Sequence, residues 1–183
     1  FFIISAGLDT HAPNRGDLYK NSYRFLQEMN QAVPGIFQKI DGFASHSYPN
    51  NNFSASPQSD KSGGVTVYRD EVRFLKQYFG RDNIPIFITE TGWEQGHSSE
   101  ESVASFYQYA FENIWQEGNI IAIPPFLLTG AGSRFSGFSL LKVDGNPSGI
   151  FETIRSLPKT RGDPVLAPVE KKEESQRHPT YKK

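Results

Sequence analysis

Residues 84–93, IPIFITETGW, decide both the fold class and the place to look for a site. Residues 84–89 form a short, continuous apolar run rich in β-branched and aromatic side chains. Such a run is typical of a strand buried on both faces in a parallel sheet. Glu90 follows at the C-terminal end of this run, where burying a carboxylate is costly unless it is paired or functional. Gly92 then permits a sharp turn, so we expect Glu90 to stand at the edge of the sheet.

Three further apolar runs of the same kind occur, and the four runs start about 40 residues apart. They are residues 1–6 (FFIISA), 40–45 (IDGFAS) and 120–128 (IIAIPPFLL). Patterns of helical spacing separate them, at residues 22–31, 68–79, about 98–116 and about 149–156, with Gly80 as a natural C-cap and Ser98 or Ser99 as an N-cap. This order predicts four βα units, hence a parallel sheet with right-handed crossovers.

Two α/β architectures fit this order: half of a (β/α)₈ barrel, or a small doubly wound sheet. The long polar segments follow the expected strands, and both architectures carry their functional loops at that end. The positions of these loops therefore indicate where the site lies, but they do not distinguish the two architectures. Residues 161–183 are rich in Pro, Glu and Lys, so we expect residues 1–160 to form the domain and 161–183 to be a disordered tail or linker.

Composition narrows the classes of function. A hydrophobic content of 37% in 183 residues supports one packed domain, and a net charge of −1 gives no footprint for nucleic acid or an anionic membrane. No apolar run reaches the roughly 18 residues of a membrane span. The absence of Cys excludes a thiolate nucleophile and Cys-ligated zinc, and the four His residues are scattered. We expect no metal and no cofactor.

A second group of polar residues lies in residues 41–49, DGFASHSYP. His46 and Tyr48 are two apart, so they share one face at the end of their strand. Either side chain can donate a hydrogen bond to Glu90 or to a sugar hydroxyl. A bond to Glu90 would orient that carboxylate and keep it ionised. Trp93 offers an aromatic plane for a sugar face, and a carboxylate beside an aromatic suits an oxocarbenium-like transition state.

Each candidate also has a purely structural interpretation. Glu90 is then an ion-paired carboxylate inside the sheet, His46 a core histidine and Tyr48 a cap on its strand. Trp93 packs on the rim of the domain. Asp9 and His11, which follow the first expected strand, either line the cleft as binding residues or belong to an ordinary loop.

The combination of ITETGW with a strand ending in His-x-Tyr-Pro about 40 residues earlier resembles the clan A retaining glycoside hydrolases, such as families 5 and 39. The resemblance covers roughly residues 1–157. It implies a partial (β/α)₈ TIM barrel, with residues 1–6 as strand five and 120–128 as strand eight. Glu90 then matches the nucleophile that closes strand seven. His46 and Tyr48 match the residues that close strand six.

Two features depart from the clan's pattern. Its acid/base Glu closes strand four, and this chain starts at strand five, so no residue here matches it. A Trp is common at the end of strand eight, where this chain reads PPFLLTG. The resemblance thus implies the C-terminal half of a glycosidase for β-linked oligo- or polysaccharide. Its N-terminal half and its acid/base would lie upstream, so we expect this fragment alone to be inactive and its parent to be extracellular or on the cell surface.

Two other functions stay open. One is a non-catalytic carbohydrate-binding or surface protein that keeps a degenerate barrel. The other is a complete small α/β domain of unrelated function. A half barrel should expose two unpaired sheet edges and therefore aggregate or dimerise, whereas a complete domain should not.

Overall fold

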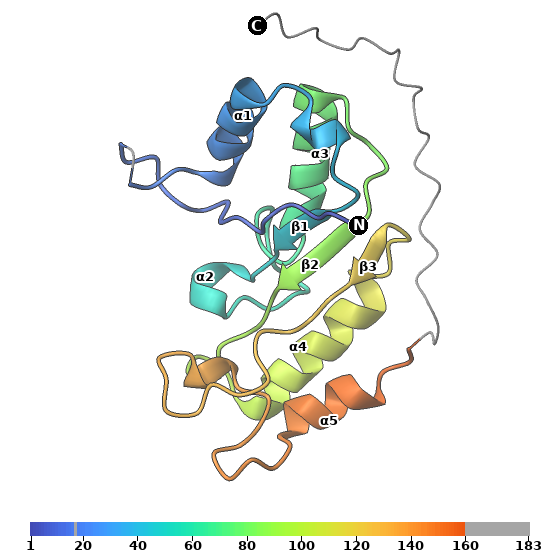
Figure 1. Cartoon of the computed structure of the whole chain (residues 1–183). Helices are drawn as coiled ribbons and strands as arrows, with labels where there is room; N and C mark the ends of the chain where they lie inside the picture. Colours follow the sequence, from blue (N-terminus) through green and yellow to red (C-terminus); the bar gives the residue numbers. More distant parts are fainter. Residues whose placement is uncertain (17, 160–183) are drawn as a thin grey trace, which may run out of the picture.

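The computed structural model describes residues 1–16 and 18–159, which fold around one small parallel sheet (Figure 1). Its strands are β1 (Phe43–His46), β2 (Ile86–Glu90) and β3 (Ile120–Ala122), hydrogen-bonded in that order. Both strand pairs are parallel, and each crossover contains a long helix. The expected mixed α/β organisation is therefore confirmed, with β2 at the centre of the sheet.

Four helices lie close to their predicted positions: α1 (Ser22–Ala32), α3 (Val67–Phe79), α4 (Glu100–Asn113) and α5 (Gly149–Ser156). Their ends follow from capping chemistry. The Ser99 side chain accepts a hydrogen bond from Ser102 N at the start of α4, and Gly80 ends α3 in the left-handed conformation with φ 62°. Three short elements were not predicted: the 3₁₀ turns Ile36–Gln38 and Ser136–Phe138, and α2 (Asn50–Phe53).

The core lies where the sheet meets its helices. Ile86 and Ile88 of β2 are completely buried, as is Leu75 of α3. The indoles of Trp93 and Trp115 are also buried, and each satisfies its N–H with a backbone carbonyl. Large aromatic side chains fill a core well, provided that their polar atoms find partners. The fold therefore uses much of its aromatic content for packing.

Two predicted strands are wrong in extent. Residues 1–6 make a single isolated parallel bridge, Ile4 with Gly42, and residues 1–4 are exposed. The segment runs beside the chain just before β1 begins, and no described strand lies on its other side. The predicted run 120–128 contains a strand of only three residues, because Pro124 and Pro125 lack the N–H groups that a ladder requires.

The three strands leave the sheet open, with β1 and β3 at its edges. Figure 1 shows that the C-terminal ends of the strands point the same way and that α2 lies beside them. No helix among the described residues is long and apolar enough to cross a membrane. The predicted tail at 161–183 lies outside the described residues.

Candidate functional site

The candidate site forms where β1 and β2 end side by side. His46 is paired with Glu90 in the parallel register. Tyr48 Oη donates a hydrogen bond to Glu90 Oε2 over 3.1 Å, and His46 Nδ1 lies 3.6 Å from the same oxygen. The structure thus brings together three residues that the sequence placed at the ends of two strands.

Backbone contacts hold the two strand ends in register beyond the ladder. Ser47 N donates to Glu90 O over 3.0 Å, and Thr91 Oγ1 donates to Ser47 O over 2.6 Å. On the other side, Gly7 lies against the His46 ring so closely that a Cβ there would come within 2.1 Å of His46 Nε2. Glycine is therefore required at position 7 for His46 to keep its place.

Tyr48 is suited to be a permanent donor. Burial raises the pKa of its phenol well above the usual range, and the negative charge of Glu90 and the hydrogen bond to it raise this pKa further. The ring is enclosed by edge-to-face contacts with Phe53, Phe126 and Phe138. Tyr48 therefore stays protonated at physiological pH and directs its O–H towards Glu90.

These residues open onto a cleft of about 530 Å³. The Glu90 side chain is 38% exposed, so a ligand in the cleft can reach its carboxylate. Asp9 and His11 line the same cleft, which places five sequence-predicted site residues around one hollow. Asp9 Oδ1 accepts a hydrogen bond from His11 N over 2.8 Å, so the Asp9 carboxylate holds this turn together. The roles of these two residues in binding stay predictions.

The rest of the lining comes from a segment that sequence reasoning missed. Residues 49–53 border the cleft, and three consecutive residues, Asn51, Asn52 and Phe53, have φ values of 53°, 53° and 62°. Asn tolerates the left-handed region and Phe does so rarely. The Asn run in NNNFS was the available signal, because Asn favours turns of this kind.

Asp60 fixes the loop that carries this segment. Its Oδ1 accepts hydrogen bonds from Asn50 Nδ2 over 2.7 Å and from Lys61 N over 2.9 Å, and its Oδ2 accepts one from Val65 N over 3.0 Å. Gly64 lies against the Asp60 carboxylate, where a Cβ would come within 2.0 Å of Oδ2. One carboxylate therefore ties both ends of the loop to each other.

The prediction that Trp93 is a sugar platform is wrong. Its side chain is 1% exposed and packs against Phe106, Tyr107 and Trp115, while Nε1 donates to Ala55 O over 2.8 Å. Phe106 and Tyr107 belong to α4, so the indole fills the space between this helix and the chain after β2. A ring buried in this way cannot present a face to a ligand.

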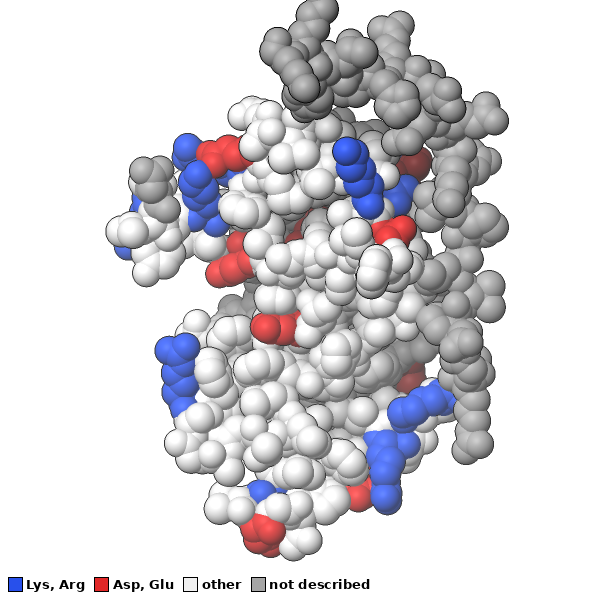
Figure 2. Space-filling model, in the orientation of Figure 1, with Lys and Arg blue, Asp and Glu red and all other residues white. Residues whose placement is uncertain are grey.

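Charge around the site is sparse. The cleft is lined by Asp9 and Glu90 and, among the described residues, by no Lys or Arg. Figure 2 shows red and blue side chains scattered among uncharged ones on the face in view. Within residues 1–16 and 18–159, no group of three or more His, Cys, Asp or Glu is arranged to hold a metal ion.

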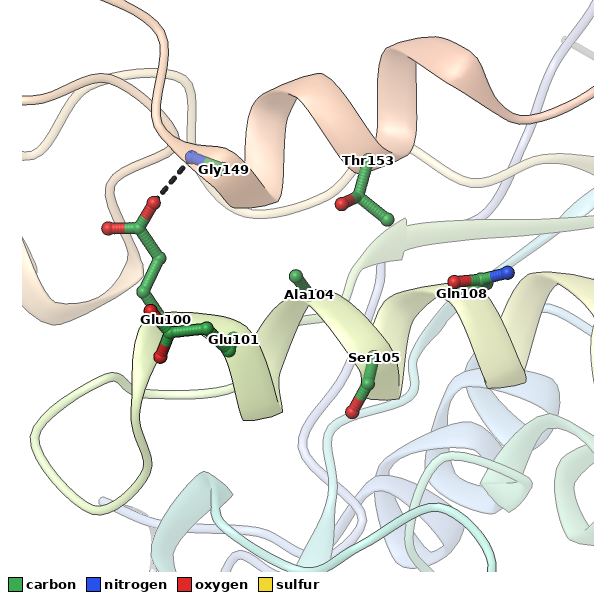
Figure 3. A pocket seen from close by; sticks show the side chains of 7 residues that line it. All are labelled: Glu100, Glu101, Ala104, Ser105, Gln108, Gly149 and Thr153. Atoms are coloured by element: carbon green, nitrogen blue, oxygen red, sulfur yellow. Dashed lines mark hydrogen bonds between the residues drawn. The ribbon is translucent and has the colours of Figure 1, made fainter.

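A second hollow, of about 380 Å³, lies between α4 and α5 (Figure 3). The Glu100 carboxylate accepts a hydrogen bond there from Gly149 N, the first backbone amide of α5. A carboxylate at a helix N-terminus stabilises that helix through its dipole. This hollow therefore has a structural explanation that does not involve a ligand.

No family model matches the sequence, and no curated protein matches it. Two solved structures are similar. One is a subgroup II family 128 endo-β-1,3-glucanase from Sorangium cellulosum, with a TM-score of 0.60 and 16% identity over 87% of this chain. The other is a family 39 glycoside hydrolase from the gut symbiont Bacteroides cellulosilyticus WH2, with a TM-score of 0.48 and 15% identity over 70% of this chain. The chain spans 56% of the glucanase, and at this identity the likeness shows that the two share a fold.

Proposed function

We propose that this chain is part of a retaining glycoside hydrolase that cleaves β-linked oligo- or polysaccharide, with Glu90 as its nucleophile. One observation carries the proposal: Tyr48 Oη and His46 Nδ1 both face Glu90 Oε2 at the floor of an open cleft. The shared fold with an endo-glucanase supports the proposal, because it puts the same strand arrangement in an enzyme of this class. In the same proposal, the three strands are strands six to eight of a (β/α)₈ barrel.

Glu90 attacks the anomeric carbon from its exposed side and forms a covalent glycosyl-enzyme, which water later hydrolyses. Tyr48 orients the attacking carboxylate through its hydrogen bond to Oε2. Since that bond occupies Oε2, Glu90 Oε1 is the oxygen that faces the substrate. His46 Nδ1 lies 3.6 Å from Oε2, the oxygen that Tyr48 also contacts, and helps to position the carboxylate.

Retaining chemistry also requires an acid/base group about 5–5.5 Å from the nucleophile. Asp9 is the other carboxylate that lines the described cleft, and its Oδ1 is engaged by His11 N. We therefore assign Asp9 to substrate binding and the acid/base role to a Glu that is not among the described lining residues. That Glu would protonate the leaving oxygen and then deprotonate the attacking water.

A mechanism-based fluoroglycoside tests the nucleophile in the full-length protein. We expect one covalent sugar adduct, on Glu90, located by peptide mass spectrometry. The Glu90→Gln variant should show no adduct, and Glu94→Gln, which changes a nearby carboxylate outside the cleft, should be labelled like the unaltered protein. Labelling at another residue, or turnover without any labelling of Glu90, would remove Glu90 from the nucleophile role.

A non-catalytic carbohydrate-binding protein is the alternative that the open cleft also accommodates. Such a protein would bind oligosaccharides, and neither turnover nor covalent labelling would occur. Measuring sugar binding and labelling on the same preparation separates the two functions.

A further inference from the structure

We propose that Phe53, which lies on the left-handed turn of residues 51–53, is the aromatic platform on which a sugar ring stacks in this cleft. The same proposal holds that the cleft binds neutral sugars in preference to anionic ones. The proposal rests on the proposed function for its substrate class. It gives the aromatic role to Phe53 in place of Trp93, which is buried in the core.

The position of Phe53 relative to Glu90 is the first argument. Phe53 lines the same cleft as Glu90 and is 38% exposed. Its ring meets the Tyr48 ring edge to face at 5.1 Å and the Phe138 ring at 5.2 Å. Tyr48 in turn donates a hydrogen bond to Glu90, so Phe53 packs directly against the residue that binds the nucleophile. A sugar in contact with Glu90 therefore lies beside Phe53.

The backbone that presents Phe53 is the second argument. Three consecutive non-glycine residues in the left-handed region are unfavourable, and the bulky Phe53 is the most unfavourable of them. Such strain persists where surrounding contacts determine the conformation, and it concentrates at ligand sites. Here Phe53 O accepts a hydrogen bond from Glu94 N over 3.1 Å, and Asp60 anchors Asn50 just before the turn. The turn is thus fixed at both ends, with Phe53 on the cleft.

The chemistry of the turn matches a neutral pyranose. An exposed aromatic face packs against the C–H groups of a sugar ring, and amides serve its hydroxyls as donors and acceptors. Asn51 and Asn52 line the cleft and are exposed, so their side-chain amides are accessible to a ligand. The turn therefore combines one apolar surface with two polar side chains available to hydroxyl groups.

The charge of the cleft explains the preference for neutral sugars. Its described lining contains the carboxylates of Asp9 and Glu90 and neither Lys nor Arg. A uronate or sulfate group in the cleft would face two carboxylates without a Lys or Arg partner, and such repulsion is an effective way to reject a ligand.

Binding to the full-length protein that carries Glu90→Gln tests the proposal, because that substitution prevents turnover. Calorimetry would compare β-1,3- and β-1,4-linked glucohexaoses with a β-1,4-linked hexasaccharide of alternating glucose and glucuronate. We expect Phe53→Ala and Phe53→Gly to weaken binding of the better glucohexaose by about 10- to 30-fold. Phe53→Tyr should restore it. The Gly variant keeps the left-handed backbone accessible, so a loss of binding there cannot be attributed to backbone strain at position 53.

Phe135→Ala is the matched control, since Phe135 is a similarly exposed ring outside the cleft lining, and its binding should be unchanged. The proposal is overturned if Phe53→Gly binds like the parent, if the glucuronate hexasaccharide binds as tightly as the neutral one, or if no hexasaccharide binds at all. If binding depends on Phe53 but the fluoroglycoside does not label Glu90, the stacking role of Phe53 stands and the glycosidase function is overturned. If the fluoroglycoside labels Glu90 but binding does not depend on Phe53, the glycosidase function stands and the stacking role of Phe53 is overturned.

Discussion

Tyr48 Oη lies 3.1 Å from Glu90 Oε2, and this hydrogen bond joins the ends of two adjacent parallel strands. Removing the hydroxyl in Tyr48→Phe leaves the ring packing intact. A hydrogen bond to a charged group contributes about 1.5–3 kcal/mol, so kcat/KM on an aryl glycoside should fall by about 10- to 160-fold in the full-length protein.

The control for that variant is Tyr78→Phe, which removes an exposed hydroxyl on α3. It should change neither activity nor melting temperature. If Tyr48→Phe retains full kcat/KM while remaining folded, then the hydrogen bond from Tyr48 to Glu90 does not contribute to catalysis.

Gly7→Ala should displace His46. The new Cβ would stand 2.1 Å from His46 Nε2, so the ring must move, and His46 Nδ1 would lose its place 3.6 Å from Glu90 Oε2. Small displacements of a positioning group are costly, and we expect about a 10- to 100-fold loss of kcat/KM. Steady-state kinetics should be measured beside Gly118→Ala, where a Cβ meets open space and activity should be unaffected. Equal activity of the two variants would contradict a positioning role for His46.

The sequence predicts best where the signals are local. The helix that ends at Gly80 and the helix capped by Ser99 follow from single residues with defined backbone roles. The strand leading to Glu90 follows from its apolar run, and the neighbourhood of Glu90, His46 and Tyr48 follows from the parallel order of the strands.

Prediction fails where the outcome depends on partners remote in sequence. Residues 1–4 have the composition of a buried strand, yet they are exposed because no described strand pairs with their outer side. Trp93 follows Glu90 by three residues, which suggests that both line one cleft, but its ring packs against Tyr107 of α4 instead. The contribution of Phe53 to the cleft depends on Asp60 anchoring its loop, and sequence spacing does not reveal that anchor.

Trp93 should matter for stability. Replacing a fully buried aromatic residue by Ala costs about 3–5 kcal/mol, so Trp93→Ala should lower the free energy of unfolding by that amount in urea titrations. Trp93→Phe keeps much of the packing and leaves Ala55 O without its donor, for a smaller cost of about 1–3 kcal/mol. Phe53→Ala, at an exposed ring, should cost less than either. A Trp93→Ala protein of unaltered stability would refute the core assignment.

Glu71 makes the stability of the fold depend on pH. Its side chain is buried on α3, neither carboxyl oxygen has a hydrogen-bond partner among the described residues, and burial raises its pKa from 4.5 to about 8. Ser45, whose hydroxyl is hydrogen-bonded to Ser47 Oγ, lowers the pKa of Glu71 only in part, and the charge of Asp70 raises it further. Between these two pKa values the folded state holds a proton that the unfolded state has released. Raising the pH therefore favours the unfolded state.

The free energy of unfolding should accordingly fall as pH rises from about 5 to 8, by at most about 1.4 kcal/mol per pH unit from this group. Glu71→Gln removes the titration. Its free energy of unfolding should therefore rise with pH relative to that of the unaltered protein, as measured by urea titrations at pH 5, 6.5 and 8. Glu112→Gln, at an exposed position on α4, should leave the pH dependence as it is. If Glu71→Gln and the unaltered protein keep a constant difference across this range, the carboxyl does not titrate there, and the burial of Glu71 has no part in the pH response.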